Sequence, residues 1–164
     1  MDIMTYYIIM SCPIPTLLEK QKQLMCGKHA INNLLQDNVA NCKNLKAIGK
    51  RLSTNYGVNL NELIDNATGY YDVSVLFTFL NEMGYDVSDV PRVKFESISR
   101  RQSNRLIGYI FGNGVHWVAV RKTQNRGCYF EIDSLHDQPI KIKVIKNWLL
   151  HNKQLIAIKV LRPK

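Results

Sequence analysis

Apolar residues in the first half of the chain recur every three or four positions, a spacing that predicts helices. The clearest example is the segment 19–36, which ends at a polar Asp37-Asn38 pair. Its apolar residues share one side of such a helix: Leu24, Ile31, Leu34 and Leu35. The same spacing occurs in three further segments: 44–52, 60–64 and 73–83. Asp72 can cap the last of these helices, and Gly84 is suited to the position after its end.

Beyond Gly84 the pattern changes to short apolar stretches separated by turn residues, which predicts strands. We expect five of them: 85–87, 106–111, 115–121, 128–132 and 155–161. Gly112-Asn113-Gly114 is typical of a hairpin turn. Residues 90–105 predict a basic, irregular connection with one helical turn, and residues 140–150 predict a final helix. Helices followed by an antiparallel sheet predict an α+β fold with the helices packed on the sheet.

Length and composition fit one globular domain with its own core. The chain has 164 residues, of which 46% are hydrophobic and 21% charged, which argues against general disorder. No apolar run approaches the ~20 residues of a membrane span. The apolar stretch at residues 4–10 is short, lacks a basic flank and is followed by Pro13 and Pro15. We therefore expect a packed arm, an extra strand or a loose terminus there, and not a signal peptide.

The formal net charge of +9 allows an anionic partner such as nucleic acid, a membrane surface or an acidic protein. The Lys and Arg residues are spread along the whole chain, and no nucleic-acid-binding motif or glycine-rich phosphate loop accompanies them. A solvated basic surface is the simpler interpretation. Nucleic-acid binding is therefore the less favoured alternative.

The four cysteines are widely scattered and form no C-x-x-C pair: Cys12, Cys26, Cys42 and Cys128. Their spacing to histidines does not match a zinc site, so we expect no metal and no cofactor. An even number of cysteines permits disulfides, but a chain of this size with an ordinary core does not need them. We expect a reducing compartment, the cytoplasm, with the nucleus as an alternative location.

Cys26 is the first candidate for chemistry. The predicted helix places it in a first turn, where free backbone N–H groups and the helix dipole favour negative charge. This environment lowers the pKa of a thiol and makes the nucleophilic thiolate more available. The alternative is a buried structural cysteine, since free cysteines are often buried.

A nucleophilic cysteine needs a base, and the base needs a group that orients it. His116 follows the glycine turn at the start of one predicted strand, and Asp133 follows the end of the next. Adjacent antiparallel strands bring such positions together, so Cys26, His116 and Asp133 form a candidate triad. Gln21, five residues before the cysteine, can donate to the developing oxyanion together with the Cys26 N–H.

Other histidines and aromatic residues near these positions have alternative roles. His29 lies one helical turn after Cys26 and could compete as base, but the geometry favours a supporting or structural role. His136 could line the cleft. Trp117 can pack in the core beneath the hairpin, and the alternative is that it forms a wall of the substrate channel.

The chain resembles the Josephin-domain cysteine proteases in several blocks that follow the order of the family. These blocks are EKQKQLMC at 19–26, HAINNLLQ at 29–36, GYYDVSVL at 69–76, GYDV at 84–87, HWVAVR at 116–121 and YFEIDSL at 129–135. Together they extend from residue 19 to about residue 158. The pattern is most similar to the compact, single-domain Josephin proteins.

The resemblance implies a papain-like α+β fold in which a helical part carries the nucleophile and an antiparallel sheet carries the histidine and the aspartate. It divides the chain into an N-terminal extension, 1–18, and a catalytic domain, 19–164. A helical arm over the substrate site would correspond to residues 52–70. We expect four residues to contact the substrate: Tyr70, Tyr71, Trp117 and His136.

The implied activity is that of a deubiquitinase, which hydrolyses the isopeptide or peptide bond after the C-terminal glycine of ubiquitin through a thioester. Cys26 is then the nucleophile, His116 the base and later the acid, and Asp133 the orienting group. Gln21 is the implied oxyanion donor. The expected partners are ubiquitin or ubiquitin chains, and the oligomeric state stays open. Two alternatives stand: a ubiquitin-binding module with relic catalytic residues, and a protease for a ubiquitin-like modifier or another protein.

Overall fold

The computed structural model describes residues 12–21, 25–89, 100–123, 127–152 and 156–163. Its helices are α2 (Cys26–Leu35), α3 (Cys42–Tyr56), α4 (Leu60–Leu63), α5 (Val73–Glu82), α6 (Arg100–Arg105) and α7 (Ile145–His151). Its strands are β1 (Ile64–Asp65), β2 (Tyr70–Tyr71), β3 (Asp86–Asp89), β4 (Leu106–Gly112), β5 (Trp117–Lys122), β6 (Tyr129–Ile132), β7 (Ile140–Ile142) and β8 (Ile156–Leu161). No helix among these residues is long and apolar enough to cross a membrane.

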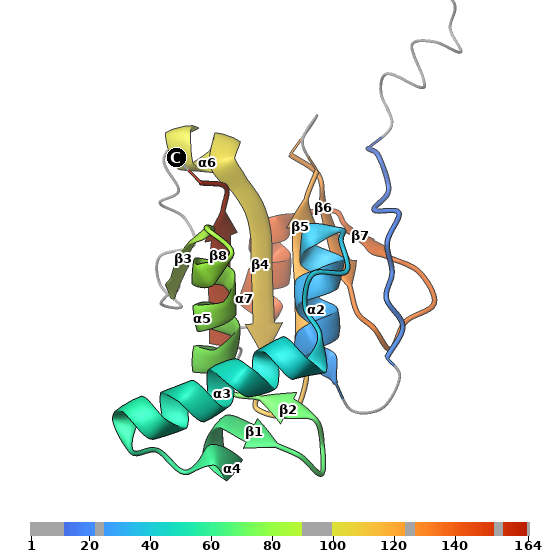
Figure 1. Ribbon diagram of the computed structural model, residues 1–164. Helices are drawn as coiled ribbons and strands as arrows, with labels where there is room; N and C mark the ends of the chain where they lie inside the picture. Colours follow the sequence, from blue (N-terminus) through green and yellow to red (C-terminus); the bar gives the residue numbers. More distant parts are fainter. Residues whose placement is uncertain (1–11, 22–24, 90–99, 124–126, 153–155, 164) are drawn as a thin grey trace, which may run out of the picture.

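A six-stranded antiparallel sheet forms the centre of the molecule, with the strand order β3-β8-β4-β5-β6-β7 (Figure 1). Helices α2 and α5 lie on one face of the sheet, and α7 lies on the other. Helix α3 packs on α5 and crosses the end of this layer, next to α4 and the small β1–β2 ribbon. The predicted α+β fold is therefore confirmed.

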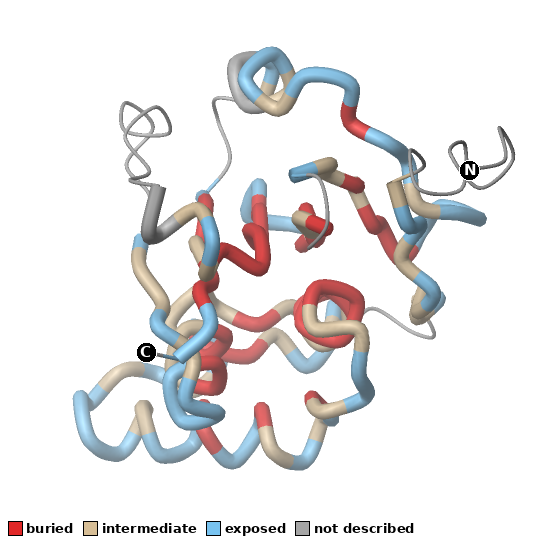
Figure 2. The backbone as a smooth tube through the Cα atoms, turned by 90° about the horizontal axis from the view of Figure 1, so that it is seen from above, coloured by how far each residue is buried: buried red, intermediate tan, exposed pale blue. Residues whose placement is uncertain are grey.

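The sheet has an apolar core on each face. The larger core lies between the sheet and α2, α3 and α5, and the smaller core lies under α7. Strand β4 runs between them, so all seven of its residues are buried, as expected for a strand covered on both faces. In Figure 2 the buried segments gather in the interior, and the exposed segments form the periphery.

The structure differs from the predicted elements in three places. The helix expected over residues 19–36 begins only at Cys26, because Leu17 and Glu19 bond to side chains along α2 instead of extending it. The helix expected over residues 140–150 is split: β7 pairs with β6, and α7 begins at Ile145. The β1–β2 ribbon was not predicted, since each strand has only two residues.

The N-terminal segment 12–21, here called the strap, lies along α2. The Leu17 N–H donates to the side-chain oxygen of Gln36, whose amide nitrogen donates back to the Leu17 carbonyl, both at 2.9 Å. The Glu19 N–H donates to the side chain of Asn33 at 2.6 Å. Part of the predicted extension 1–18 therefore contacts the domain directly, whereas residues 1–11 lie outside the described residues.

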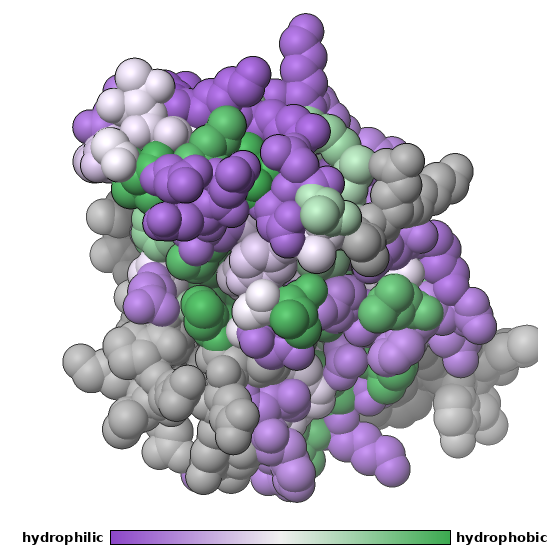
Figure 3. All heavy atoms as spheres, turned by 90° about the horizontal axis from the view of Figure 1, so that it is seen from below, coloured by the Kyte–Doolittle hydropathy of each residue, from purple (hydrophilic) through white to green (hydrophobic). Residues whose placement is uncertain are grey.

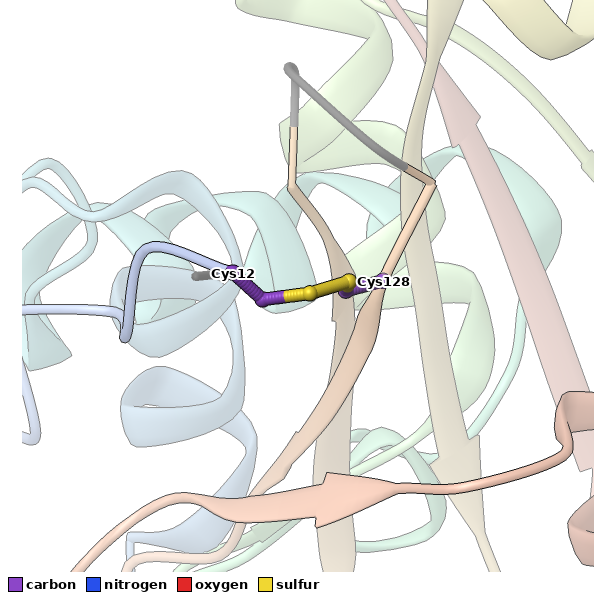
Figure 4. Close-up of a disulfide and its surroundings, with 2 residues drawn as sticks. All are labelled: Cys12 and Cys128. Carbon is purple, nitrogen blue, oxygen red and sulfur yellow. A yellow bond between two sulfur atoms is a disulfide. The ribbon is translucent and has the colours of Figure 1, made fainter. Parts of the chain in front are cut away.

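The strap is also attached to the sheet by a disulfide between Cys12 and Cys128, which precedes β6 (Figure 4). This bond was not predicted, because the two cysteines are 116 residues apart in the chain. Only the antiparallel strands and the course of the strap bring the two sulfur atoms together. Cys26 and Cys42 are free.

The side of the molecule seen from below carries mainly hydrophilic side chains, with apolar ones scattered among them (Figure 3). This side includes the exterior of α3 and α4, which lie at the bottom of Figure 1. Single exposed apolar side chains of this kind are normal for a protein surface.

Candidate active site

The turn between β4 and β5 places His116 at the end of the sheet. The Asn113 side chain fixes this turn, since its oxygen accepts from the N–H groups of Val115 (3.1 Å) and His116 (2.9 Å). Strand β5 then pairs with β6 so that Ala119 lies opposite Ile132. This register brings the start of β5 beside the end of β6, where Asp133 follows.

His116 and Asp133 form a hydrogen-bonded pair, with 2.8 Å between Nε2 and the carboxylate Oδ1. The same oxygen accepts from the Leu135 N–H at 2.9 Å, and the His136 N–H donates to the Asp133 main-chain oxygen at 3.0 Å. Burial raises the pKa of Asp133, but the hydrogen bonds from His116 and Leu135 outweigh it and the net pKa is lowered. Asp133 is therefore held as a carboxylate that faces the imidazole.

Cys26 is the first residue of α2 and is only 3% exposed. It lies close enough to His116 to affect the pKa of the imidazole. The hydrogen bond that His116 makes to the Asp133 carboxylate, and then the interaction with Cys26, raise the pKa of His116 to about 9 against the opposing effect of burial. The three residues of the candidate triad thus meet in one cluster.

The two nitrogens of His116 have different partners. Because Nε2 faces the Asp133 carboxylate, Nδ1 is the nitrogen that remains for Cys26. An imidazole held in this way can accept the thiol proton at Nδ1 and stay hydrogen-bonded at Nε2, which stabilises an imidazolium–thiolate pair. The start of α2 adds free backbone N–H groups beside the sulfur. This arrangement is suited to nucleophilic attack on a carbonyl.

Gln21 reaches the same cluster from the strap. Its N–H donates to the Ser134 main-chain oxygen at 3.0 Å, and the Ser134 hydroxyl donates to the Gln21 side-chain oxygen at 3.1 Å. One residue further back, Lys20 pairs with Asp137 at 2.6 Å. The turn that begins at Asp133 therefore holds both His116 and Gln21.

Glu19 fixes the strap to α2, a role that the sequence analysis missed. Its carboxylate accepts from Lys28 and from Asn32, and lies 3.1 Å from Nδ1 of His29. Burial raises the pKa of Glu19, whereas the bonds from Lys28, Asn32 and His29 lower it, with a net lowering. The charged residue Glu19, two residues before Gln21, was the signal in the sequence from which this attachment could have been predicted. His29 is buried beside Glu19, in agreement with a supporting role.

Two of the four residues predicted to contact substrate are buried. Trp117 is 0% exposed, and its Nε1 donates to the main-chain oxygen of Tyr71, itself 1% exposed, at 2.9 Å. In this conformation their side chains face the core and offer no surface to a substrate. Of the two interpretations of Trp117, packing in the core therefore matches its position, because the register of β5 turns its side chain inward.

The other two residues lie beside the triad. Tyr70 is partly exposed and stacks on Trp117 with ring centroids 5.7 Å apart. Burial raises the pKa of Tyr70, and the charges of Asp72 and Cys26 raise it further, so its hydroxyl is within electrostatic range of the thiol. His136 is exposed and its charge helps to lower the pKa of Asp133.

One group of side chains has the composition of a metal site: Glu131, Asp133 and His136, with ligand atoms within 4.8 Å of one another. The two carboxylates already have partners, however. Asp133 accepts from His116, and Glu131 accepts from the Trp148 indole at 2.7 Å. These hydrogen bonds already explain the positions of both carboxylates, so we do not infer a metal site from this group of side chains.

Comparison with known proteins connects this site to one family. Residues 21–155 match the sequence model of the Josephin family. A Josephin-like protein of Arabidopsis thaliana is 31% identical over 137 residues, covering 71% of this chain and 38% of the relative. An ataxin-3 homolog of Caenorhabditis briggsae is 25% identical over 140 residues, covering 77% and 42%, and mouse Josephin-2 is 27% identical over 130 residues, covering 71% and 66%. The chain thus spans between 38% and 66% of these relatives' lengths.

Proposed function

The chain belongs to the Josephin family of papain-like proteins, and on this basis we propose that it is a cysteine deubiquitinase. The proposed reaction is hydrolysis of the isopeptide or peptide bond after the C-terminal glycine of ubiquitin. In it, Cys26 is the nucleophile, His116 the base and later the acid, and Asp133 the group that orients His116. Gln21 and the Cys26 N–H are the proposed oxyanion donors.

The observation that carries the proposal is the position of His116 beside both Asp133 and Cys26. Its Nε2 is 2.8 Å from the Asp133 carboxylate, and Cys26 is near enough to contribute to its pKa of about 9. A histidine with this pKa is protonated at neutral pH, so the proton it takes from the thiol stays on the imidazole. A buried structural cysteine would not need such a partner.

The proposed reaction proceeds by two acyl transfers. The Cys26 sulfur attacks the glycine carbonyl carbon, and the negative charge that forms on its oxygen is stabilised by Gln21 and the α2 N-terminus. His116 gives its proton to the leaving amine, the C–N bond breaks, and a thioester remains. Water then attacks the thioester while His116 takes a proton from it. The C–S bond breaks, His116 returns its proton to the Cys26 sulfur, and the product leaves as a carboxylate after losing the second proton of the water to solvent.

Ubiquitin as the substrate rests on the family. The described surface adds that Tyr70 and His136, both at least partly exposed, lie beside the triad and are available to the extended C-terminal segment of a substrate. The proposed partners are therefore ubiquitin or ubiquitin chains.

The experiment uses a ubiquitin whose C-terminus carries an electrophile, together with a fluorogenic ubiquitin C-terminal reporter. The wild-type chain is expected to form a covalent adduct and to hydrolyse the reporter at neutral pH. Cys26→Ala abolishes both, and His116→Ala lowers turnover by about 10²- to 10⁴-fold. Cys42→Ala is the matched control, because it removes the other free thiol and leaves both reactions intact.

Each alternative function gives a different result. A binding module with relic residues binds ubiquitin but neither reacts with the electrophile nor hydrolyses the reporter. A protease for a ubiquitin-like modifier hydrolyses the reporter made from that modifier and leaves the ubiquitin reporter intact. Full activity of the Cys26→Ala variant would contradict the proposed mechanism itself.

A further inference from the structure

The turn after β6 holds the carboxamide of Gln21 at two points. One bond runs from the Gln21 N–H to the Ser134 main-chain oxygen (3.0 Å), and the other from the Ser134 hydroxyl to the Gln21 Oε1 (3.1 Å). Ser134 is 3% exposed, so water does not readily replace its hydroxyl as the partner of Gln21. The first bond positions the main chain, and the second acts on the amide alone.

The orientation of this amide matters because its two ends have opposite chemistry. The Nε2 end donates hydrogen bonds and stabilises an oxyanion, whereas the Oε1 end accepts them and would repel the same charge. Rotation of the amide by half a turn exchanges the two ends. A hydroxyl that donates to Oε1 favours the orientation in which Nε2 points away from Ser134.

We propose that Ser134 is a positioning residue that directs the Nε2 of Gln21 toward the oxyanion formed during acyl transfer. The inference rests on the proposed function, because an oxyanion exists only if the site attacks a carbonyl. It gives the Asp133–Ser134 turn two tasks: Asp133 orients the base, and Ser134 orients the oxyanion donor.

The rest of the strap allows the hydroxyl to be tested by itself. Main-chain and side-chain bonds at Leu17 and Glu19 hold the strap on α2, and the Gln21 N–H bonds to a main-chain oxygen that every residue at position 134 retains. Ser134→Ala therefore keeps the position of Gln21 and removes only the bond that selects the amide orientation.

The expected loss follows from the strength of that bond. A neutral hydrogen bond changes an equilibrium by about 3- to 10-fold, whereas removal of a complete oxyanion donor costs about 10²- to 10³-fold. Ser134→Ala is therefore expected to lower kcat on the ubiquitin reporter by about 3- to 10-fold with little change in KM. Gln21→Ala is expected to lower kcat by the larger factor.

The test is a double-mutant cycle of Gln21→Ala and Ser134→Ala, with alkylation of Cys26 by iodoacetamide as the second readout. Alkylation needs the thiolate but no oxyanion donor, so its rate and pH dependence should be the same in all four proteins. In the Gln21→Ala background, Ser134→Ala should cause no further loss of kcat. Ser103→Ala is the matched control, because it removes a serine hydroxyl that bonds to Lys122 at the end of β5 opposite His116, and it should leave kcat unchanged.

A third readout separates this inference from the proposed function. The side-chain amide of Gln21, followed by ¹⁵N NMR relaxation, is expected to be ordered in the wild type and mobile in Ser134→Ala. If this difference in mobility is found but the wild type does not hydrolyse the reporter, the positioning of Gln21 by Ser134 is supported and the proposed deubiquitinase activity is rejected. Equal mobility in both proteins, additive losses in the cycle or slower alkylation in Ser134→Ala would each overturn the inference.

Discussion

Replacement of Asp133 by Asn isolates the charge of the group that orients His116. The asparagine keeps an oxygen that can accept from Nε2, but it carries no negative charge. Asp133 provides the largest contribution to the raised pKa of His116, ahead of Cys26. The variant therefore tests whether the imidazolium is stabilised by the carboxylate itself.

The magnitude follows from the pKa of about 9, compared with an ordinary value of 6.5. This difference corresponds to about 3 kcal/mol in favour of the protonated form. An adjacent opposite charge raises the pKa of a histidine by about 1–3 pH units, and Cys26 remains in the variant. We expect Asp133→Asn to lower the pKa of His116 by about 1–2 pH units, to about 7–8.

Histidine NMR titration measures this change directly, since the chain has four histidines and single replacements assign each signal. Glu131→Gln is the matched control: it removes one carboxylate two residues away, whose partner is Trp148. The pKa of His116 should stay near 9 in that variant. A value near 9 in Asp133→Asn as well would refute the assignment of the shift to Asp133.

The same change should appear in activity and stability. The active pair needs a protonated His116, so the alkaline limb of kcat/KM is expected near pH 9 and should move to about pH 7–8 in Asp133→Asn. Because folding raises this pKa, the stability that His116 contributes is complete below pH 6.5 and is lost as the pH rises through 9. The free energy of unfolding of the wild type should fall over that window, and less so in the variant.

Three further predictions concern the fold. Replacing Cys12 and Cys128 by serine should lower the free energy of unfolding by about 2–4 kcal/mol, since the cross-link spans 116 residues; urea unfolding of the wild type in reductant should then match the variant. Gly112→Ala should cost about 1–3 kcal/mol, because its Cβ would lie 2.3 Å from the Trp117 ring; an unchanged urea midpoint would show that the ring can move. Asp72→Ala should lower thermal stability by about 1 kcal/mol through loss of the cap on Ser74 N–H, and Asp72→Asn should restore most of it.

The bonds of the strap could not be predicted from the sequence, because they join residues far apart in the chain. Periodicity describes one element at a time, and the residues 19–21 carry a helical pattern as easily as an extended one. Their conformation was decided by partners on α2 and on the turn after β6, namely Asn33 and Ser134. The pattern of apolar and polar residues within one segment does not indicate such partners.

The sequence by itself determined the order and type of most elements, the α+β class and the residues capable of nucleophilic chemistry. Apolar spacing reports which face of an element is buried, and Cys26, His116 and Asp133 stand out because each lies at the end of an element. The tertiary structure decided which of them meet. The register of β5 on β6 joined His116 to Asp133 and turned Trp117 inward, and the strap brought Gln21 to Ser134. Pairing across the sheet depends on contacts between distant segments, which local propensity does not encode.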